Sequence, residues 1–126
     1  MPNLRRLLIV EDEPILALEL KEDLQDSGFD VVEVVADADK VLASFLKHRP
    51  DLVLMDIKLY GFRDGIDSAV QIRGFYPTPL IYLSSYPEAE VKDRLERTAP
   101  YIYLEKPYNL DRLKEALLRL LPGASL

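Results

Sequence analysis

Hydrophobic positions along the chain form short continuous runs that alternate with segments of helical periodicity. Five apolar or β-branched runs typical of buried strands lie at 6–10, 30–35, 51–57, 80–85 and 101–105. Apolar residues recur every three or four positions in the segments that follow them, which predicts five helices within 14–28, 38–49, 66–76, 87–98 and 109–121. Apolar strands that alternate with helices indicate a parallel sheet covered on both faces, so we predict an α/β fold.

Local signals mark where several of these helices begin and end. Gly28 is a stop signal after the first helical segment, and Pro50 ends the second. Asn109 precedes the last and most regular apolar stripe, which makes it the expected N-cap of that helix. The segment 87–98 has the weakest apolar stripe of the five.

Composition is that of a globular protein with a single domain. The 126 residues are 48% hydrophobic and 30% charged, and we expect one domain over 1–126 with its core at about 5–121. The absence of cysteine excludes a disulfide framework and a thiolate site, which fits the expected cytoplasmic location. A net charge of −6 argues against a nucleic-acid surface, and no apolar run approaches the roughly 20 residues that span a membrane.

Polar side chains follow the predicted strands where each one ends. Glu11 and Asp12 come directly after the first strand in the stretch LLIVEDEPIL, and Asp56 lies at the end of the third. Ser84 ends the fourth strand and Lys106 follows the fifth. Carboxyl ends of parallel strands meet at one edge of a sheet, where ligands bind, so we expect these five side chains to converge.

The converging groups indicate a particular chemistry. Neighbouring acids near a core repel one another and lose solvation, and a divalent cation would offset this cost at Glu11, Asp12 and Asp56. Oxygen ligands without histidine or cysteine suit Mg²⁺, with Mn²⁺ as an alternative. Lys106 would attract an anion to the same place, and the Ser84 hydroxyl would hydrogen-bond to it. Metal, carboxylate and ammonium together suit phosphoryl transfer to an aspartate.

Four segments, LLIVEDEP, DLVLMDIKL with DGID, LIYLSS and YIYLEKPYNL, resemble in order and spacing the receiver domain of two-component response regulators. The resemblance runs from about 7 to 121 and implies a flavodoxin-like, doubly wound parallel sheet with strand order 2-1-3-4-5. It also implies that Asp56 accepts a phosphoryl group from a phosphohistidine of a histidine kinase. A receiver is a signalling domain and not an enzyme for other substrates, because it catalyses only its own phosphorylation and dephosphorylation.

The resemblance assigns the remaining roles residue by residue. Glu11, Asp12 and Asp56 would hold Mg²⁺ together with the backbone carbonyl of Lys58. Lys106 would pair with a phosphoryl oxygen.

The same resemblance implies a conformational switch. Ser84 would contact the phosphoryl group and shift on activation, with Tyr103 as its aromatic partner, and the peptide bond between Lys106 and Pro107 is expected to be cis. The expected partners are a sensor histidine kinase or phosphotransfer protein, and an output domain, protein or second copy. The output partner would bind the face formed by the fourth helix, the fifth strand and the fifth helix.

Two features depart from the family pattern. The loop after Asp56, IKLYGFRDG, lacks the proline that is common there and is extended by Tyr60, Gly61, Phe62 and Arg63. Ile102 occupies a position where a small residue is frequent. These departures concern the contacts of the loop and the rotation of Tyr103, and they leave the phosphoacceptor in place.

Other readings of the sequence remain open. Each polar residue taken alone has an ordinary structural role, for example acids before Pro14 at a helix start. A degenerate receiver could act only as an interaction module. An aspartyl-phosphate hydrolase would need a second acid where Lys58 stands, and a flavodoxin-like cofactor binder would need a phosphate loop where the chain has EDEP. His48, at a helix end, is expected to be neither ligand nor phosphodonor.

Overall fold

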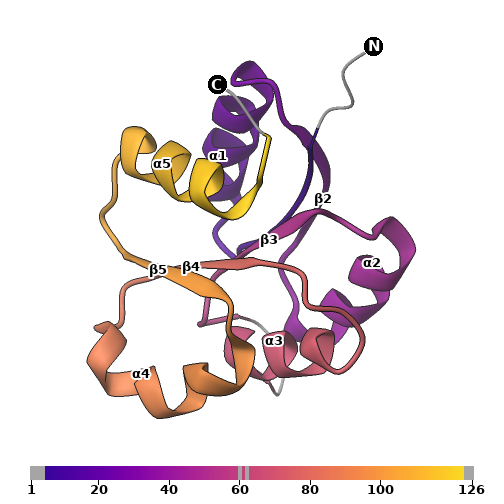
Figure 1. Ribbon diagram of the computed structural model, residues 1–126, viewed down its shortest axis with the longest axis vertical. Coiled ribbons are helices and arrows are strands. Elements are labelled where there is room, and N and C mark those ends of the chain that lie inside the picture. The colour runs from indigo at the N-terminus through magenta and orange to yellow at the C-terminus, as the bar shows by residue number, and fades with distance from the viewer. Residues whose placement is uncertain (1–4, 60, 62, 124–126) are drawn as a thin grey trace.

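The computed structural model describes residues 5–59, 61 and 63–123, and Figure 1 shows their arrangement. One parallel sheet has the order β2-β1-β3-β4-β5. Its strands are β1 (Arg6–Val10), β2 (Asp30–Val35), β3 (Leu52–Met55), β4 (Leu80–Ser84) and β5 (Tyr101–Glu105). The predicted fold class and strand order are therefore confirmed.

Five α-helices connect and follow the strands within the described residues. They are α1 (Pro14–Asp26), α2 (Val41–His48), α3 (Gly65–Arg73), α4 (Glu88–Leu95) and α5 (Leu110–Leu120). Among these helices, none is both long and apolar enough to cross a membrane.

The helix boundaries follow local chemistry. Asn109 caps α5 as predicted, because its side chain accepts a hydrogen bond from the Arg112 amide at 2.8 Å. The C-cap of α2 is Arg49, which has a left-handed conformation with φ of 46°. The segments predicted at 38–49 and 87–98 each include a 3₁₀ turn, η1 (Ala38–Lys40) before α2 and η2 (Glu96–Thr98) after α4. α3 stops at Arg73 and not at 76, because Gly74 is its C-cap.

Helices cover both faces of the sheet. α1 and α5 lie on one face, and α2, α3 and α4 lie on the other (Figure 1). Successive strand residues point to opposite faces of the sheet. Leu7 and Ile9 of β1 therefore pack in the core beneath α1 and α5, while Leu8 and Val10 pack in the core beneath α2, α3 and α4. The central strand β3 is apolar and buried along its whole length because both faces are covered, whereas the edge strand β2 is partly exposed and carries Glu33.

Candidate functional site

Two of the predicted acids extend strands of the sheet. The Glu11 amide donates to the Val35 carbonyl at 2.9 Å, and the Asp56 amide donates to the Val10 carbonyl at 2.9 Å. These bonds continue the backbone ladder one residue beyond β1 and β3, which fixes both acids at the carboxyl edge of the sheet. Glu11 is 3% exposed and Asp56 is 6% exposed, so both carboxylates are held away from bulk water.

Lys106 bridges these two carboxylates. Its Nζ lies 2.9 Å from Glu11 Oε1 and 3.3 Å from Asp56 Oδ2. The Lys106 amide donates to the Ser84 carbonyl at 2.7 Å, which attaches the segment after β5 to the end of β4. The peptide bond between Lys106 and Pro107 is cis. The ammonium thus offsets the repulsion between two buried acids from different strands.

Asp12 completes a cluster of three acids. One carboxylate oxygen from each of Glu11, Asp12 and Asp56 lies within 4.8 Å of the other two. Burial raises the pKa of Glu11, and its contact with Asp56 adds to the rise while Lys106 opposes it. Burial and the neighbouring Glu11 raise the pKa of Asp12. Three carboxylate donors concentrated in this way fit a Mg²⁺ ion that retains several water ligands.

Backbone amides hold the two buried carboxylates in orientation. Glu11 Oε2 accepts from the amides of Asp12 at 3.0 Å and Glu13 at 3.3 Å. Asp56 Oδ1 accepts from the amide of Lys58 at 3.3 Å. Lys58 is therefore adjacent to the cluster through its backbone, while its side chain is exposed. The carbonyl of Lys58 as a metal ligand stays a prediction.

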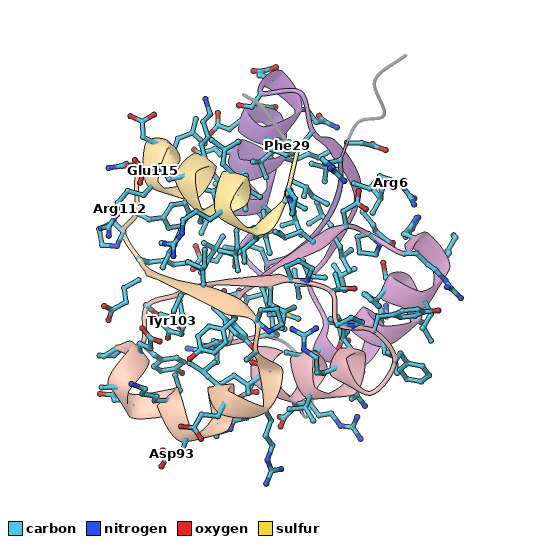
Figure 2. The ribbon with its side chains drawn as sticks, in the orientation of Figure 1. Arg6, Phe29, Asp93, Tyr103, Arg112 and Glu115 are labelled. Carbon is cyan, nitrogen blue, oxygen red and sulfur yellow. The ribbon has the colours of Figure 1, made fainter. Side chains whose placement is uncertain are left out.

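The two predicted switch residues share one neighbour in the loop before α4. Ser84 is fully buried, and its Oγ accepts from the Tyr86 amide at 3.0 Å. The Tyr103 hydroxyl donates to the Tyr86 carbonyl at 2.7 Å. Figure 2 shows Tyr103 on the side of β5 that faces α4, where its ring packs against that of Tyr82 with 6.0 Å between centroids.

Gly65 is a site residue to which the sequence analysis gave no role. Its amide donates to the Ile57 carbonyl at 2.7 Å, so α3 begins directly behind the phosphoacceptor candidate. A Cβ at this position would lie 1.9 Å from the Asp56 carbonyl oxygen, which excludes every other residue without a backbone shift. The motif DGID contains the signal, but the contact that requires glycine is tertiary.

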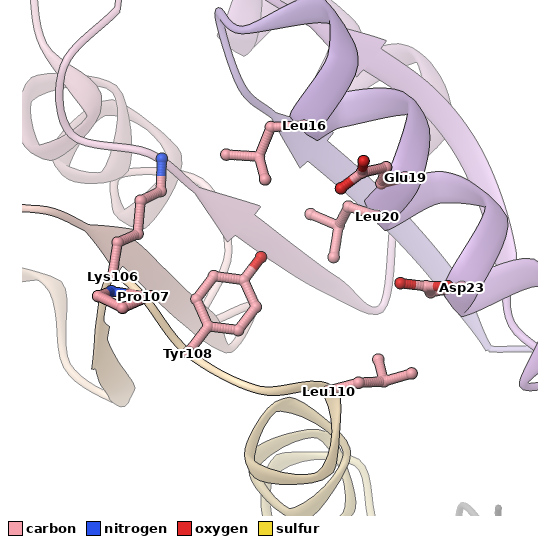
Figure 3. A pocket seen from close by; sticks show the side chains of 8 residues that line it. All are labelled: Leu16, Glu19, Leu20, Asp23, Lys106, Pro107, Tyr108 and Leu110. Atoms are coloured by element: carbon pink, nitrogen blue, oxygen red, sulfur yellow. The ribbon is translucent and has the colours of Figure 1, made fainter.

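A groove beside the acids was also not predicted. It lies between α1 and the segment that follows β5, and Figure 3 shows Lys106 and Tyr108 on one side and Leu16, Glu19 and Leu20 on the other. The floor is apolar and Glu19 brings an acid to the rim. Burial raises the pKa of Tyr108 to about 12, so its hydroxyl stays protonated.

Two further sequence predictions concern the loop after Asp56 and His48 at the end of α2. Tyr60 and Phe62 lie outside the described residues. Gly61 between them has a φ of 104°, and a Cβ there would lie 2.8 Å from Asp37 Oδ1, so the loop after Asp56 reaches the turn before η1.

His48 Nε2 lies 3.2 Å from Glu33 Oε1, and its carbonyl accepts from Arg6 at the start of β1. His48 is thus at the opposite edge of the sheet from the acids.

The fold and the acidic edge together define a class of protein, a doubly wound domain in which a lysine contacts a buried aspartate at the carboxyl ends of the strands. Residues 7–118 match the response regulator receiver domain model. The chain therefore belongs to the response regulator receiver domain family of two-component systems.

Individual relatives agree with this family. The chain is 33% identical over 113 residues to the transcriptional regulatory protein PdtaR of Mycobacterium tuberculosis, which covers 90% of this chain and 55% of that protein. It therefore spans about half the length of this curated relative. The receiver domain of a modulated diguanylate cyclase from Desulfovibrio desulfuricans is 32% identical, with a TM-score of 0.83 and 91% of both chains covered. The BeF3-activated RstA receiver of Klebsiella pneumoniae is 29% identical, with a TM-score of 0.84 over 94% of this chain and 100% of that one.

Proposed function

We propose that Asp56 accepts a phosphoryl group from the phosphohistidine of a sensor histidine kinase or phosphotransfer protein, in a reaction that needs Mg²⁺. The observation that carries the proposal is the buried Asp56 carboxylate with the Lys106 ammonium at 3.3 Å and two further acids beside it. A buried nucleophile with a fixed cation is the arrangement that phosphoryl transfer to an aspartate requires.

The transfer follows from the positions of these groups. A carboxylate oxygen of Asp56 forms the bond to phosphorus, the bond from phosphorus to the imidazole nitrogen breaks, and the histidine leaves with that electron pair. Lys106 pairs with a phosphoryl oxygen. Glu11, Asp12 and Asp56 are the side chains that would hold Mg²⁺, with the Lys58 carbonyl, and the bound ion would withdraw negative charge from the phosphoryl oxygens. Water later hydrolyses the acyl phosphate.

Conformational output is proposed to follow from the added charge. The phosphoryl group would draw Ser84 and Lys106 inward, and Tyr103 would leave the Tyr86 carbonyl and move into the space released. The surface formed by α4, β5 and α5 would then favour an output domain, an output protein or a second copy of the chain. The domain is proposed to occupy 1–126 with its core at about 5–121, and to act in the cytoplasm without binding membrane or nucleic acid directly.

Access for the donor is supported by the groove beside Lys106. Ile15 and Leu18 are 77% and 56% exposed on α1, the helix that forms one side of this groove. Exposed apolar side chains beside an acidic rim are suited to a partner protein that covers them while its phosphohistidine approaches Asp56. This surface would decide which donor is accepted, whereas the acids and Lys106 would perform the chemistry.

Intact mass tests the proposal. The protein is incubated with acetyl phosphate and Mg²⁺, alongside Asp56→Asn and the matched exposed control Asp93→Asn. We expect wild type and Asp93→Asn to gain the mass of one phosphoryl group, and to lose this gain when Mg²⁺ is chelated. Asp56→Asn is expected to gain nothing.

Other outcomes of the mass measurement, together with an assay of phosphate release, separate the alternatives. An unmodified wild type would indicate a degenerate receiver that acts only as an interaction module. Steady release of phosphate from added phosphomonoesters would indicate a hydrolase. An adduct on Asp56→Asn would move the acceptor to another residue.

A further inference from the structure

α4 is held to the rest of the molecule by few apolar contacts. Leu95 is the one buried side chain that the structure describes in this helix, and Val91 packs partly against the core beneath it. Its N-cap is Pro87, which has no side-chain hydrogen bond to the first turn. A helix with so narrow an apolar face depends on polar contacts to keep its place.

Arg94 supplies such a contact to the start of α3. Its Nη1 lies 2.7 Å from Asp64 Oδ2 and its Nη2 lies 2.8 Å from Asp64 Oδ1, which gives two parallel hydrogen bonds. Nη2 also lies 3.3 Å from Asp67 Oδ1. The side chains of Arg94 and Asp64 are 47% and 29% exposed. Paired bonds of this kind are stronger and more directional than a single surface ion pair.

The carboxylates of Asp64 and Asp67 are held in place by hydrogen bonds that do not involve Arg94. Asp64 is the N-cap of α3 and accepts from the Asp67 amide at 3.0 Å, while Asp67 accepts from the Asp64 amide at 3.0 Å. This capping box orders both side chains, so little further conformational entropy is lost when Arg94 binds them. Burial raises the pKa of Asp64, but bonds from Arg94 and from backbone amides more than reverse this and leave it lowered.

The same turn is in direct contact with the phosphoacceptor candidate. Gly65 follows Asp64, and its Cα lies so close to the Asp56 carbonyl that a Cβ would approach the oxygen to 1.9 Å. A backbone shift at Asp56 must therefore displace Gly65 and the adjoining Asp64. Two parallel bonds tolerate little misalignment, so such a displacement weakens the contact with Arg94.

A second set of hydrogen bonds holds the residues that directly follow Arg94. The Tyr82 hydroxyl lies 2.8 Å from Thr98 Oγ1, which in turn donates to the Leu95 carbonyl at 2.7 Å. Arg73 donates to the Thr98 carbonyl through Nη2 at 2.6 Å. These bonds hold η2 and the Leu95 carbonyl directly after Arg94, so the pair between Arg94 and Asp64 joins the C-terminal end of α4 to the start of α3.

We propose that Arg94 is a positioning residue that tethers α4 to the turn behind Asp56 in the unphosphorylated protein, and that phosphorylation of Asp56 releases this tether. The release rests on the proposed function, whereas the tether itself does not. This tether connects α4 to Asp56 through Asp64 and Gly65. It is separate from the proposed connection through Ser84 and Tyr103.

Amide hydrogen exchange of α4 in the full chain tests the tether. Arg94→Ala is compared with wild type and with Arg97→Ala, which removes the same charge from the same surface but has no ion pair among the described residues. We expect amides of α4 to exchange about fivefold faster in Arg94→Ala and to change less than about twofold in Arg97→Ala. Arg94→Lys, which cannot form the paired bonds, is expected to resemble Arg94→Ala.

The same exchange measured after acetyl phosphate and Mg²⁺ tests the release. Exchange in the wild type should rise to the level of Arg94→Ala, and the difference between the two should disappear. Equal exchange before phosphorylation would overturn the tether, and a difference that persists afterwards would overturn the release. Intact mass is read on the same samples, so a lack of adduct would overturn the proposed function, and with it the release, while the comparison without phosphate still decides the tether.

Discussion

At the scale of single residues, the chemistry depends on side chains that neighbouring backbone holds in place. Lys106 reaches Glu11 and Asp56 because its own amide is bonded to the Ser84 carbonyl. Glu11 is oriented by the amide of the next residue, Asp12, and Asp56 by the amide of Lys58 two residues further on. Gly65 also shapes the site, although it has no side chain, because its Cα packs directly against the Asp56 carbonyl.

Gly65→Ala is predicted to damage both stability and phosphorylation. The new methyl group would lie 1.9 Å from the Asp56 carbonyl oxygen, and the backbone must move to accept it. We expect the free energy of unfolding to fall by about 2 kcal/mol or more, with slower formation of the phosphoryl adduct. Denaturant unfolding and the rate of adduct formation measure the two effects.

Gly74→Ala is the matched control for this change. Gly74 has an ordinary φ of −67°, and a Cβ there would meet the Gln71 carbonyl at 3.3 Å, a contact that a small shift relieves. The free energy of unfolding should change by less than about 1 kcal/mol. Equal losses in the two variants would contradict the contact between Gly65 and Asp56 as the cause.

At the scale of elements, polar contacts decide how the helices on the second face attach to one another. Arg94 joins α4 to α3 through the capping box, and Arg73 joins the end of α3 to the segments that precede β4 and β5. Arg73 Nη1 donates to the Thr78 carbonyl at 2.5 Å and Nη2 to the Thr98 carbonyl at 2.6 Å. These bonds satisfy carbonyls that no helix or strand pairs.

Arg73→Met is predicted to destabilise the fold without touching the acidic site. Methionine fills much of the same volume but leaves the carbonyls of Thr78 and Thr98 without the charged donor, and we expect a loss of about 2 kcal/mol in the free energy of unfolding. Arg97→Met, at an exposed position of η2, should cost less than about 0.5 kcal/mol. Chemical denaturation of both variants checks this, and an unchanged midpoint for Arg73→Met would be evidence against its role.

At the scale of the whole molecule, charge concentrated at one edge of the sheet links stability to metal and to pH. The sheet brings three acids from two strand ends within 4.8 Å, and burial raises the pKa of Glu11 and Asp12. In the metal-free protein these ionised acids oppose folding, because their pKa is higher in the folded than in the unfolded chain. Their cost is present at neutral pH and is relieved as pH falls through the raised pKa values.

Mg²⁺ is therefore predicted to stabilise the protein, and to do so less as the solution is acidified. At a hundredfold excess over its dissociation constant the ion should add about 2.7 kcal/mol to the free energy of unfolding. Protons compete for Glu11 and Asp12, so the gain should shrink as pH falls toward about 5. Thermal melting with and without Mg²⁺ measures it. Asp12→Asn should abolish most of the gain, and a gain that this variant retains in full would place the ion elsewhere.

Much of this architecture was predictable because local sequence encodes it. Continuous apolar runs indicate which strands are covered on both faces. Helical periodicity indicates which faces of α1, α2 and α5 pack against the sheet. Boundaries were less accurate where a 3₁₀ turn replaces part of a helix, as at 96–98, because few apolar contacts specify α4. The topology rule for parallel sheets then placed the acids, Ser84 and Lys106 at one edge.

The sequence by itself determined the fold class, the identity of the acids and the edge where they gather, since periodicity and strand ends are local properties. Only the tertiary structure decided which groups touch. Lys106 contacts Glu11 and Asp56 across 95 and 50 positions of the chain, and Arg94 contacts Asp64 across 30. Position 65 requires glycine because the Asp56 carbonyl, at the end of β3, occupies the space that a Cβ would need. Such contacts depend on how separate elements pack together, to within an ångström, and no local pattern encodes that distance.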